Sequence, residues 1–167
     1  KKSKALPRGH WLVLADPHGL GVELADSLSN LGNEVNLVQL DSSSTNSPDH
    51  VYQLVYDSVR SLPDNQIWAG IINCWPLAIR DMEDGISDAG QGLVCGSFVA
   101  VAQELISVNS STMCVAITNN AVSINEKEDV LHPYQSTIWG LIRSVAREHP
   151  ELVIQVIDIE DQKNNKI

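Results

Sequence analysis

Five short apolar runs are spaced along the chain and are separated by longer stretches of mixed character. They lie at 10–16, 34–40, 67–75, 113–118 and 152–159. The first of them, HWLVLAD, is a continuous apolar run of the kind found in strands that are buried on both faces of a parallel sheet. The pattern therefore predicts five β-strands.

Most of the stretches between these runs show helical periodicity, with apolar residues three or four positions apart. The predicted helix faces are Leu24, Leu28 and Leu31, followed by Gly32 as a C-cap; Val94, Phe98, Val101 and Leu105; and Ile138, Leu141, Ile142 and Val145, followed by Pro150. A further helix is predicted at 49–59. Strands that alternate with helices form right-handed βαβ units. We therefore expect an α/β fold in which helices cover both faces of one parallel sheet.

Composition narrows the possible partners. The chain has 167 residues, 43% of them hydrophobic, and a formal net charge of −10. One compact domain is expected at this size. The negative charge argues against nucleic acid and anionic membranes as partners, because both would repel it. No apolar run approaches the ~20 residues of a membrane helix, and no signal peptide opens the chain, so a soluble, cytoplasmic protein is expected.

The cysteines and histidines give no sign of a metal site. Cys74, Cys95 and Cys114 are odd in number and lie far apart among apolar neighbours. This pattern favours buried thiols in a reducing compartment over disulfides or zinc ligands. The histidines have no ligand spacing with one another or with the cysteines, and the acids of the loop at 76–91 indicate a solvated surface. No metal is expected.

The segment LADPHGLG at 14–21 lies where a dinucleotide-binding fold has its phosphate loop. Gly19 and Gly21 suit such a loop, but Ala15 stands where the first tight bend requires glycine. Neither the G-x-G-x-x-G spacing nor the T-G-x-x-x-G-x-G spacing of short-chain reductases is met. We interpret Ala15, Gly19 and Gly21 as a degenerate loop that binds no cofactor.

The neighbouring residues also oppose a cofactor. Pro17 has a fixed φ that restricts the turn, and Asp16 brings a negative charge to the place of the pyrophosphate. Asp41 lies 20 residues beyond Gly21, where an acid would contact an adenosine ribose, but an acid at the end of a strand is more simply a solvated loop residue.

A catalytic pair is missing as well. A short-chain reductase uses a tyrosine to protonate the carbonyl and a lysine four residues later to lower the pKa of that tyrosine. Tyr134 is suitably placed, but Ile138 follows it at that spacing. Ser123 could be the serine of such a site, although a solvent-facing loop serine is the simpler interpretation. No catalytic residue is therefore predicted.

The segment YQSTIWGLIRSVAREHPEL at 134–152 resembles one commonly like PxQAPLWGLGRVxALEHPEL in the structural subdomain of modular polyketide synthase ketoreductases. The corresponding residues are Gln135, Trp139, Gly140, Leu141, Arg143, Glu148, His149, Pro150, Glu151 and Leu152. The opening HWLVLADPHGLGVELADSLSNLGNEVNLV is similar to that subdomain's WLVxADxxGxGxxLAxxLxxxGxxVxxV. IINCWPL is similar to its VVHLWPL, and VIQVIDIED to its closing strand.

The resemblance implies a truncated Rossmann-like, short-chain-reductase-like sheet that lacks the cofactor site. It implies a linker at 1–9, the structural subdomain at 10–161, and the start of the next linker at 162–167. The glycine loop, tyrosine and serine would belong to an adjoining catalytic subdomain, where NADPH could bind. The expected partner is the rest of the same polyketide synthase chain. Because the chain lacks an initial methionine and stops just after a strand, we expect it to be an excised piece.

The signature residues also have a physical interpretation. Trp139 would fill a large hole beside the sheet, and Gly140 would let its helix approach closely. Arg143 and Arg147 could pair with Glu148 or with neighbouring acids. None of these roles is catalytic, so the six signature positions Trp139, Gly140, Arg143, Glu148, His149 and Pro150 are expected to be structural.

Three functions remain open on this basis. The first is a non-catalytic subdomain that supports a ketoreductase catalytic half, or that stands as a pseudo-ketoreductase beside another processing domain. The second is an NADPH-dependent short-chain reductase that reduces a β-keto group with an atypical glycine loop. The third is a free-standing module that binds some other nucleotide.

Overall fold

The protein folds around one five-stranded parallel sheet. The computed structural model describes residues 6–40, 47–63, 66–79, 88–108, 110–123, 130 and 132–160. The strands are β1 (His10–Ala15), β2 (Glu34–Gln39), β3 (Trp68–Asn73), β4 (Met113–Asn119) and β5 (Val153–Ile159), and their order across the sheet is β2-β1-β3-β4-β5. All four neighbouring pairs are parallel. The five predicted strands are confirmed, each to within two residues at either end.

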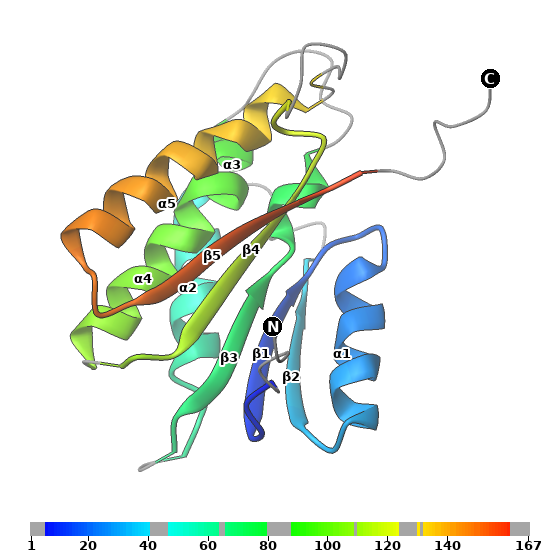
Figure 1. Cartoon of the computed structure of the whole chain (residues 1–167), viewed down its shortest axis with the longest axis vertical. Helices are drawn as coiled ribbons and strands as arrows, with labels where there is room; N and C mark the ends of the chain where they lie inside the picture. Colours follow the sequence, from blue (N-terminus) through cyan, green and yellow to red (C-terminus); the bar gives the residue numbers. More distant parts are fainter. Residues whose placement is uncertain are drawn as a thin grey trace, which may run out of the picture.

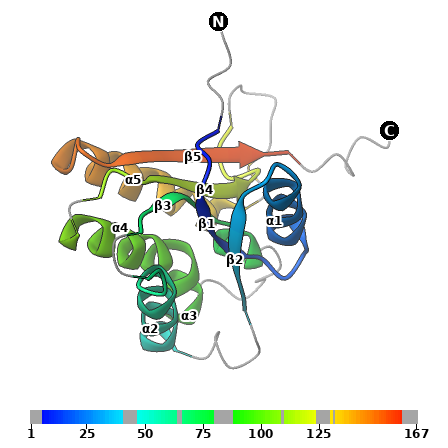
Figure 2. The same ribbon diagram turned by 90° about the horizontal axis from the view of Figure 1, so that it is seen from below.

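Helices lie on both faces of the sheet, as predicted, but they are unequally divided (Figures 1 and 2). The helices are α1 (Leu20–Asn30), α2 (Pro48–Val59), α3 (Asp88–Gln91), α4 (Ser97–Ser107) and α5 (Thr137–Glu148). Side chains of α1 pack against Trp11, Val13 and Ala15 of β1, whereas the alternate residues Leu12 and Leu14 belong to the cluster that includes α2, α4 and α5. One helix thus covers one face, and the other long helices cover the opposite face.

Chain handedness explains this division. A right-handed connection between parallel strands places its helix on a face that depends on the direction of the crossover along the sheet. The step from β1 to β2 runs in one direction, and the steps from β2 to β3, β3 to β4 and β4 to β5 all run in the other. The first step therefore places α1 on one face, and the three later steps place their helices on the other.

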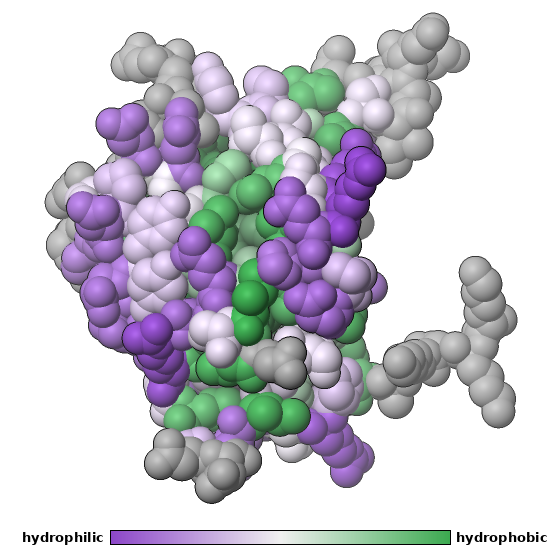
Figure 3. All heavy atoms as spheres, turned by 90° about the vertical axis from the view of Figure 1, so that its left-hand side faces the viewer, coloured by the Kyte–Doolittle hydropathy of each residue, from purple (hydrophilic) through white to green (hydrophobic). Residues whose placement is uncertain are grey.

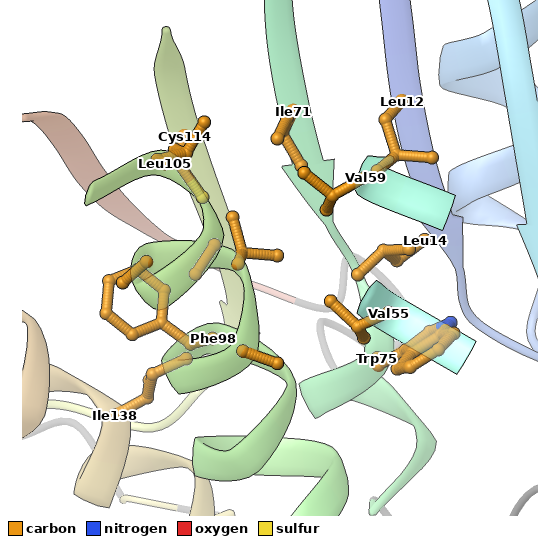
Figure 4. Close-up of a cluster of buried hydrophobic side chains, with 14 of the residues drawn as sticks. Leu12, Leu14, Val55, Val59, Ile71, Trp75, Phe98, Leu105, Cys114 and Ile138 are labelled. Carbon is orange, nitrogen blue, oxygen red and sulfur yellow. The ribbon is translucent and has the colours of Figure 1, made fainter. Parts of the chain in front are cut away.

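The main core lies between the sheet and α2, α4 and α5 (Figure 4). Leu12, Leu14 and Ile71 point from the strands toward Val55 of α2, and Phe98 lies between α4 and Ile138. The face predicted for α4 is confirmed, because Val94, Phe98, Val101 and Leu105 are all buried. Burial of this apolar surface is the main source of stability for the fold.

Two helix faces differ in detail from the prediction. The helical segment that contains α4 begins before α4 itself, because α3 continues through a π-helical turn, η2 (Gly92–Gly96), directly into α4. Leu31 was expected in the core but is 61% exposed. The reason is that α1 ends at Asn30 and Gly32 adopts a φ of 84°, which turns the chain away from the core. The C-cap is Leu31 and not Gly32 as predicted; Gly32 is the left-handed residue directly after it, and Asn33 N–H donates to the Leu28 carbonyl at 3.2 Å.

An ion pair joins α2 to α4. Arg60, just after α2, donates to both carboxylate oxygens of Glu104 at 2.6 and 2.7 Å. Glu104 is buried whereas Arg60 is largely exposed. The paired geometry satisfies a carboxylate that burial would otherwise penalise.

A pair of glycine substitutions tests this packing. Gly70 of β3 lies directly against the ring of Trp11, so a methyl group there would collide with a fully buried side chain. We expect Gly70→Ala to lower the free energy of unfolding by about 1 to 3 kcal/mol, the usual cost of overpacking. Urea unfolding would measure it.

Gly140→Ala is the matched control. A Cβ at Gly140 would meet nothing within 4 Å, and Gly140 is an exposed position inside α5. Alanine should therefore raise the stability by about 1 kcal/mol through its higher helix propensity. Equal effects of the two substitutions would contradict the packing described for β1 and β3.

Candidate functional site

The strand order creates a place where a nucleotide would bind in a doubly wound fold. The chain leaves β1 toward β2 on one side and leaves β3 toward β4 on the other, so the connections diverge at the carboxyl ends of β1 and β3. In open parallel sheets this divergence forms the ligand crevice. Here its walls are the loop before α1 and the short 3₁₀ helix η1 (Trp75–Ala78).

A carboxylate of the chain itself occupies the anion position at the start of α1. The Oδ1 atom of Asp16 accepts a hydrogen bond from Gly21 N–H at 2.7 Å, and its Oδ2 atom accepts one from His18 N–H at 2.9 Å. Asp16 is buried. Backbone N–H groups at a helix N-terminus are the donors that bind a cofactor phosphate in related folds. Asp16 takes the place of such a phosphate.

Both glycines of the degenerate loop have structural roles. Gly19 adopts a φ of 102° at the N-cap of α1, a conformation that favours glycine. Gly21 lies against β1, where a Cβ atom would be 2.5 Å from the Cα of Ala15. Ala15 itself is completely buried. The loop thus keeps the close contact between strand and helix that a phosphate loop also requires.

Apolar side chains fill the crevice. Cys74 and Leu77 are fully buried and form a cluster with Ile117 of β4. Leu20 and Leu24 from the start of α1, and Ile159 from the end of β5, pack against this cluster. Hollows of 380 and 450 Å³ lie elsewhere, beside β2 and the end of α2 and beside the end of α4 respectively. Among the described residues, apolar side chains therefore pack together at this end of the sheet.

Burial controls the chemistry of the cysteines in this region. Burial, together with the nearby charge of Asp16, raises the pKa of Cys74 to about 12. Burial alone raises the pKa of Cys114 to about 12. Both thiols are consequently neutral and unreactive at physiological pH. Cys95 is only partly buried and lies 3.3 Å from the hydroxyl of Thr137.

Polar groups at the carboxyl ends of β4 and β5 are bonded to one another. Asp158 accepts hydrogen bonds from the Thr118 hydroxyl at 2.7 Å and from the N–H groups of Ala121 and Val122. Fully buried Gln135 accepts one from Asn119 N–H at 2.8 Å. These bonds hold the segment after β4. The sequence pattern predicts no role for Asp158 and does not indicate that Gln135 is buried.

The residues considered for catalysis do not form a reductase pair. Tyr134 lies in the 3₁₀ helix η3 (Pro133–Ser136) and is 39% exposed. Ile138, at the position of the lysine, is fully buried in the main core. Ser123 is exposed. Asp41 and the acids Asp81, Glu83 and Asp84 lie outside the described residues.

The signature segment agrees only in part with expectation. Trp139 packs against the main core as expected, but it is only partly buried, and its indole N–H donates to the Thr118 hydroxyl at 3.2 Å. Gly140 faces no neighbouring element, so it does not permit a close helix approach. Within the described part of the chain, neither Arg143 nor Arg147 pairs with Glu148; both arginines are exposed to solvent.

The end of α5 is stabilised differently. His149 follows the helix, and its Nδ1 lies 3.0 Å from Glu151 Oε1. The N–H of His149 donates to the Val145 carbonyl, and the N–H of Leu152 donates to the His149 carbonyl. A backbone hydrogen bond and the contact with His149 lower the pKa of the Glu151 carboxyl. Pro150 lies just past the helix end, as expected.

Neither a metal site nor a membrane-spanning helix is found among the described residues. No group of three or more histidine, cysteine or acidic residues in that part of the chain could hold a metal ion. None of its helices is long and apolar enough to cross a membrane.

Comparison with known proteins identifies relatives of the chain. The model of the family described as "Polyketide synthase extender module SpnB, Rossmann fold domain" matches residues 78–166, which is more than half of the chain. Mycoketide-CoA synthase of Mycobacterium tuberculosis is 27% identical over 85% of this chain. The polyketide synthase component of lovastatin nonaketide synthase from Aspergillus terreus is 33% identical over 30% of it.

The solved structure of a C2-type ketoreductase from a modular polyketide synthase has the same fold. It is 22% identical, with a TM-score of 0.64, and the match covers 94% of this chain. The chain spans 34% of that ketoreductase, 4% of the mycoketide synthase and 2% of the lovastatin synthase. The truncated Rossmann-like fold and the resemblance to polyketide synthase ketoreductases are thereby confirmed.

Replacement of Asp16 tests its role as an internal anion. Asp16→Ala would leave the buried N–H of Gly21 without an acceptor, so we expect the free energy of unfolding to fall by about 1 to 3 kcal/mol. Asp26→Ala, which changes an exposed acid on the same helix, is the control and should change stability by less than about 0.5 kcal/mol. Urea unfolding at pH 7 would compare them. If both variants match the parent, the two hydrogen bonds of Asp16 contribute nothing to the fold.

Proposed function

Because the chain belongs to the family of Rossmann-fold domains of polyketide synthase extender modules, we propose that it is a non-catalytic structural subdomain of such a synthase. In this role, residues 10–161 support a ketoreductase catalytic half or an adjoining processing domain during polyketide assembly. Any reductase activity, and any NADPH binding, would belong to that neighbouring part. The linkers on either side are 1–9 and 162–167.

The observation that carries this proposal is the position of Asp16. Its carboxylate already accepts hydrogen bonds from the N–H groups that would otherwise bind a cofactor phosphate. A dinucleotide would have to displace a buried, hydrogen-bonded anion and bring its own charges beside it, and like charges at contact distance repel strongly where water is excluded. NADPH is therefore disfavoured at this helix.

The filled crevice supports the same proposal. Cys74, Leu77 and Ile117 would have to move before a nicotinamide could lie across the ends of β1 and β3. Close-packed side chains do not make room without a loss of contacts. The lysine position also holds Ile138, whose removal from the core would be costly.

A titration with NADPH tests the absence of a cofactor site. We expect isothermal calorimetry on the 167-residue chain to detect no saturable binding with a dissociation constant below roughly 100 μM, which corresponds to about −5.5 kcal/mol. Saturable binding at that strength would contradict the absence of a cofactor site. The non-catalytic role would then be wrong, and the alternative of a reductase with an atypical loop would replace it.

A stability comparison tests the supporting role. A polypeptide extended through the region that follows residue 167 should melt at a higher temperature than the chain alone and should bind less of an apolar dye, because docking covers apolar surface. Differential scanning calorimetry and dye fluorescence would measure both effects. Two independent transitions with unchanged dye binding would show separate domains and would refute the supporting role.

A further inference from the structure

Strand β2 forms one edge of the sheet, at the opposite end from β5 (Figure 2). It pairs with β1 alone, along its whole length. The N–H of Glu34 donates to the Gly9 carbonyl, so the backbone groups of Glu34 face β1. Backbone groups of successive residues in a strand point to opposite sides. Those of Val35, Leu37 and Gln39 therefore point away from the sheet, and they have no hydrogen-bond partner within the described part of the chain. Their N–H groups are called the outward amides of β2 below.

The sequence of β2 lacks the usual protection of a sheet edge. Edge strands normally carry a lysine, a proline or a bulge that prevents another strand from pairing with them. The sequence EVNLVQ contains neither lysine nor proline, and its pairing with β1 has no bulge. Its one charged residue, Glu34, lies at the start, and Leu37 near the centre is 40% exposed. The edge is thus open to an added strand.

A hollow of 380 Å³ lies beside this edge, between β2 and α2. Leu12 of β1 forms part of its lining, together with Asn36 and Val38 of β2. The opposite wall is made by the end of α2 and by Ser61, whose hydroxyl accepts a hydrogen bond from Asn36 Nδ2 at 3.1 Å. Alternate side chains of a strand added to β2 would point to the same side of the sheet as α2. The hollow gives them room.

The lining of the hollow is too polar for a typical small-molecule pocket. Such pockets are lined mainly by apolar and aromatic side chains. Here the polar residues Asn36, Asp57, Ser58 and Ser61 outnumber the apolar ones. An extended peptide suits this place better, because its backbone can bond to the outward amides while its side chains enter the hollow.

Charge determines the kind of peptide that fits. Asp57 on the wall of the hollow and Glu34 at the start of β2 are both exposed. The Arg60 guanidinium, which follows α2, is already bonded to Glu104. The chain as a whole has a net charge of −10. A segment with lysine or arginine is therefore attracted, whereas an acidic segment or a second copy of this chain is repelled.

We propose that the outer edge of β2 binds an extended, basic segment of a partner polypeptide as an additional strand of the sheet. Main-chain hydrogen bonds to the outward amides and to the carbonyls beside them hold this segment. Leu37 shares a face with Val35, which packs on the α1 side, so an apolar residue of the segment packs there. On the α2 side, a lysine or arginine faces Asp57. This binding is independent of the supporting function proposed above.

A competing apolar surface does not offer this mode of binding. Figure 3 shows a band of apolar side chains, flanked by hydrophilic ones, on the side of the molecule where α4 and α5 lie. The backbone groups of a helix bond within the helix itself, except at its ends. The band therefore provides no edge with which a strand could pair, and β2 is the favoured site for an extended segment.

Amide hydrogen exchange with a model peptide tests the proposal. The probe is a fluorescently labelled peptide of about eight alternating valine and lysine residues, within the usual length of strands. The matched control peptide has glutamate in place of lysine and should not bind. At saturation with the basic peptide, exchange of the outward amides should slow by about tenfold or more, because each gains a hydrogen bond. The amides of Glu34, Asn36 and Val38, which already bond to β1, are the internal controls and should change little.

Substitutions at Leu37 give an independent measurement. Leu37→Pro removes the central outward amide, and proline is tolerated in an edge strand where the N–H faces solvent. Fluorescence anisotropy should show that this variant binds the basic peptide about tenfold or more weakly. Leu37→Lys keeps the backbone but repels the peptide, so it should also weaken binding, and it serves if the proline variant fails to fold. Leu31→Lys, at a position exposed elsewhere, should bind like the parent.

Several results would overturn the proposal. One is the absence of saturable binding of the basic peptide up to roughly 1 mM. Another is binding that leaves exchange of the outward amides unchanged, which would place the peptide elsewhere on the acidic surface. A third is a chain that sediments as a dimer with these amides already protected, because a second copy would then occupy the edge. None of these results bears on the supporting function, which the extended polypeptide tests separately.

Discussion

The right-handed connection between parallel strands is the constraint on which the arrangement of this protein depends. After β2, every crossover runs in the same direction, so α2, α4 and α5 collect on one face and build the main core there. The single reversed crossover leaves α1 alone on the other face. Burial is therefore uneven: β1 is covered on both sides, whereas β5 is covered on one. The same constraint explains both where the core lies and where apolar surface remains exposed.

The crevice created by this topology is closed by two different kinds of interaction. At the start of α1, Asp16 satisfies N–H groups that have no partner within the helix. Behind it, Cys74, Leu77 and Ile117 form a buried apolar cluster. The two features are compatible, because a buried carboxylate is tolerated when its hydrogen bonds are made within the chain.

Local sequence patterns predicted much of this fold, but they could not predict the contacts between segments that are distant in the sequence. Strand positions follow from short apolar runs, and the face of α4 follows from the spacing of Val94, Phe98 and Val101. Leu31 fits the same spacing yet is exposed, because the helix ends one residue earlier. The close helix packing predicted at Gly140 was wrong, because which residues of a helix face a neighbouring element depends on the tertiary structure. The charge of Asp16 was recognised, but its two hydrogen bonds depend on the loop geometry set by Gly19.

The distribution of polar and apolar groups bears on what such a domain can bind. Small-molecule sites combine a concave pocket with a few polar groups that are free to contact the ligand. At the carboxyl ends of the strands, Asp16, Thr118 and Asp158 are bonded within the chain, and Cys74, Leu77 and Ile117 form a buried apolar cluster nearby. At β5 the opposite holds, because apolar side chains are exposed on an open surface. Open apolar surface recognises another folded body better than a charged cofactor.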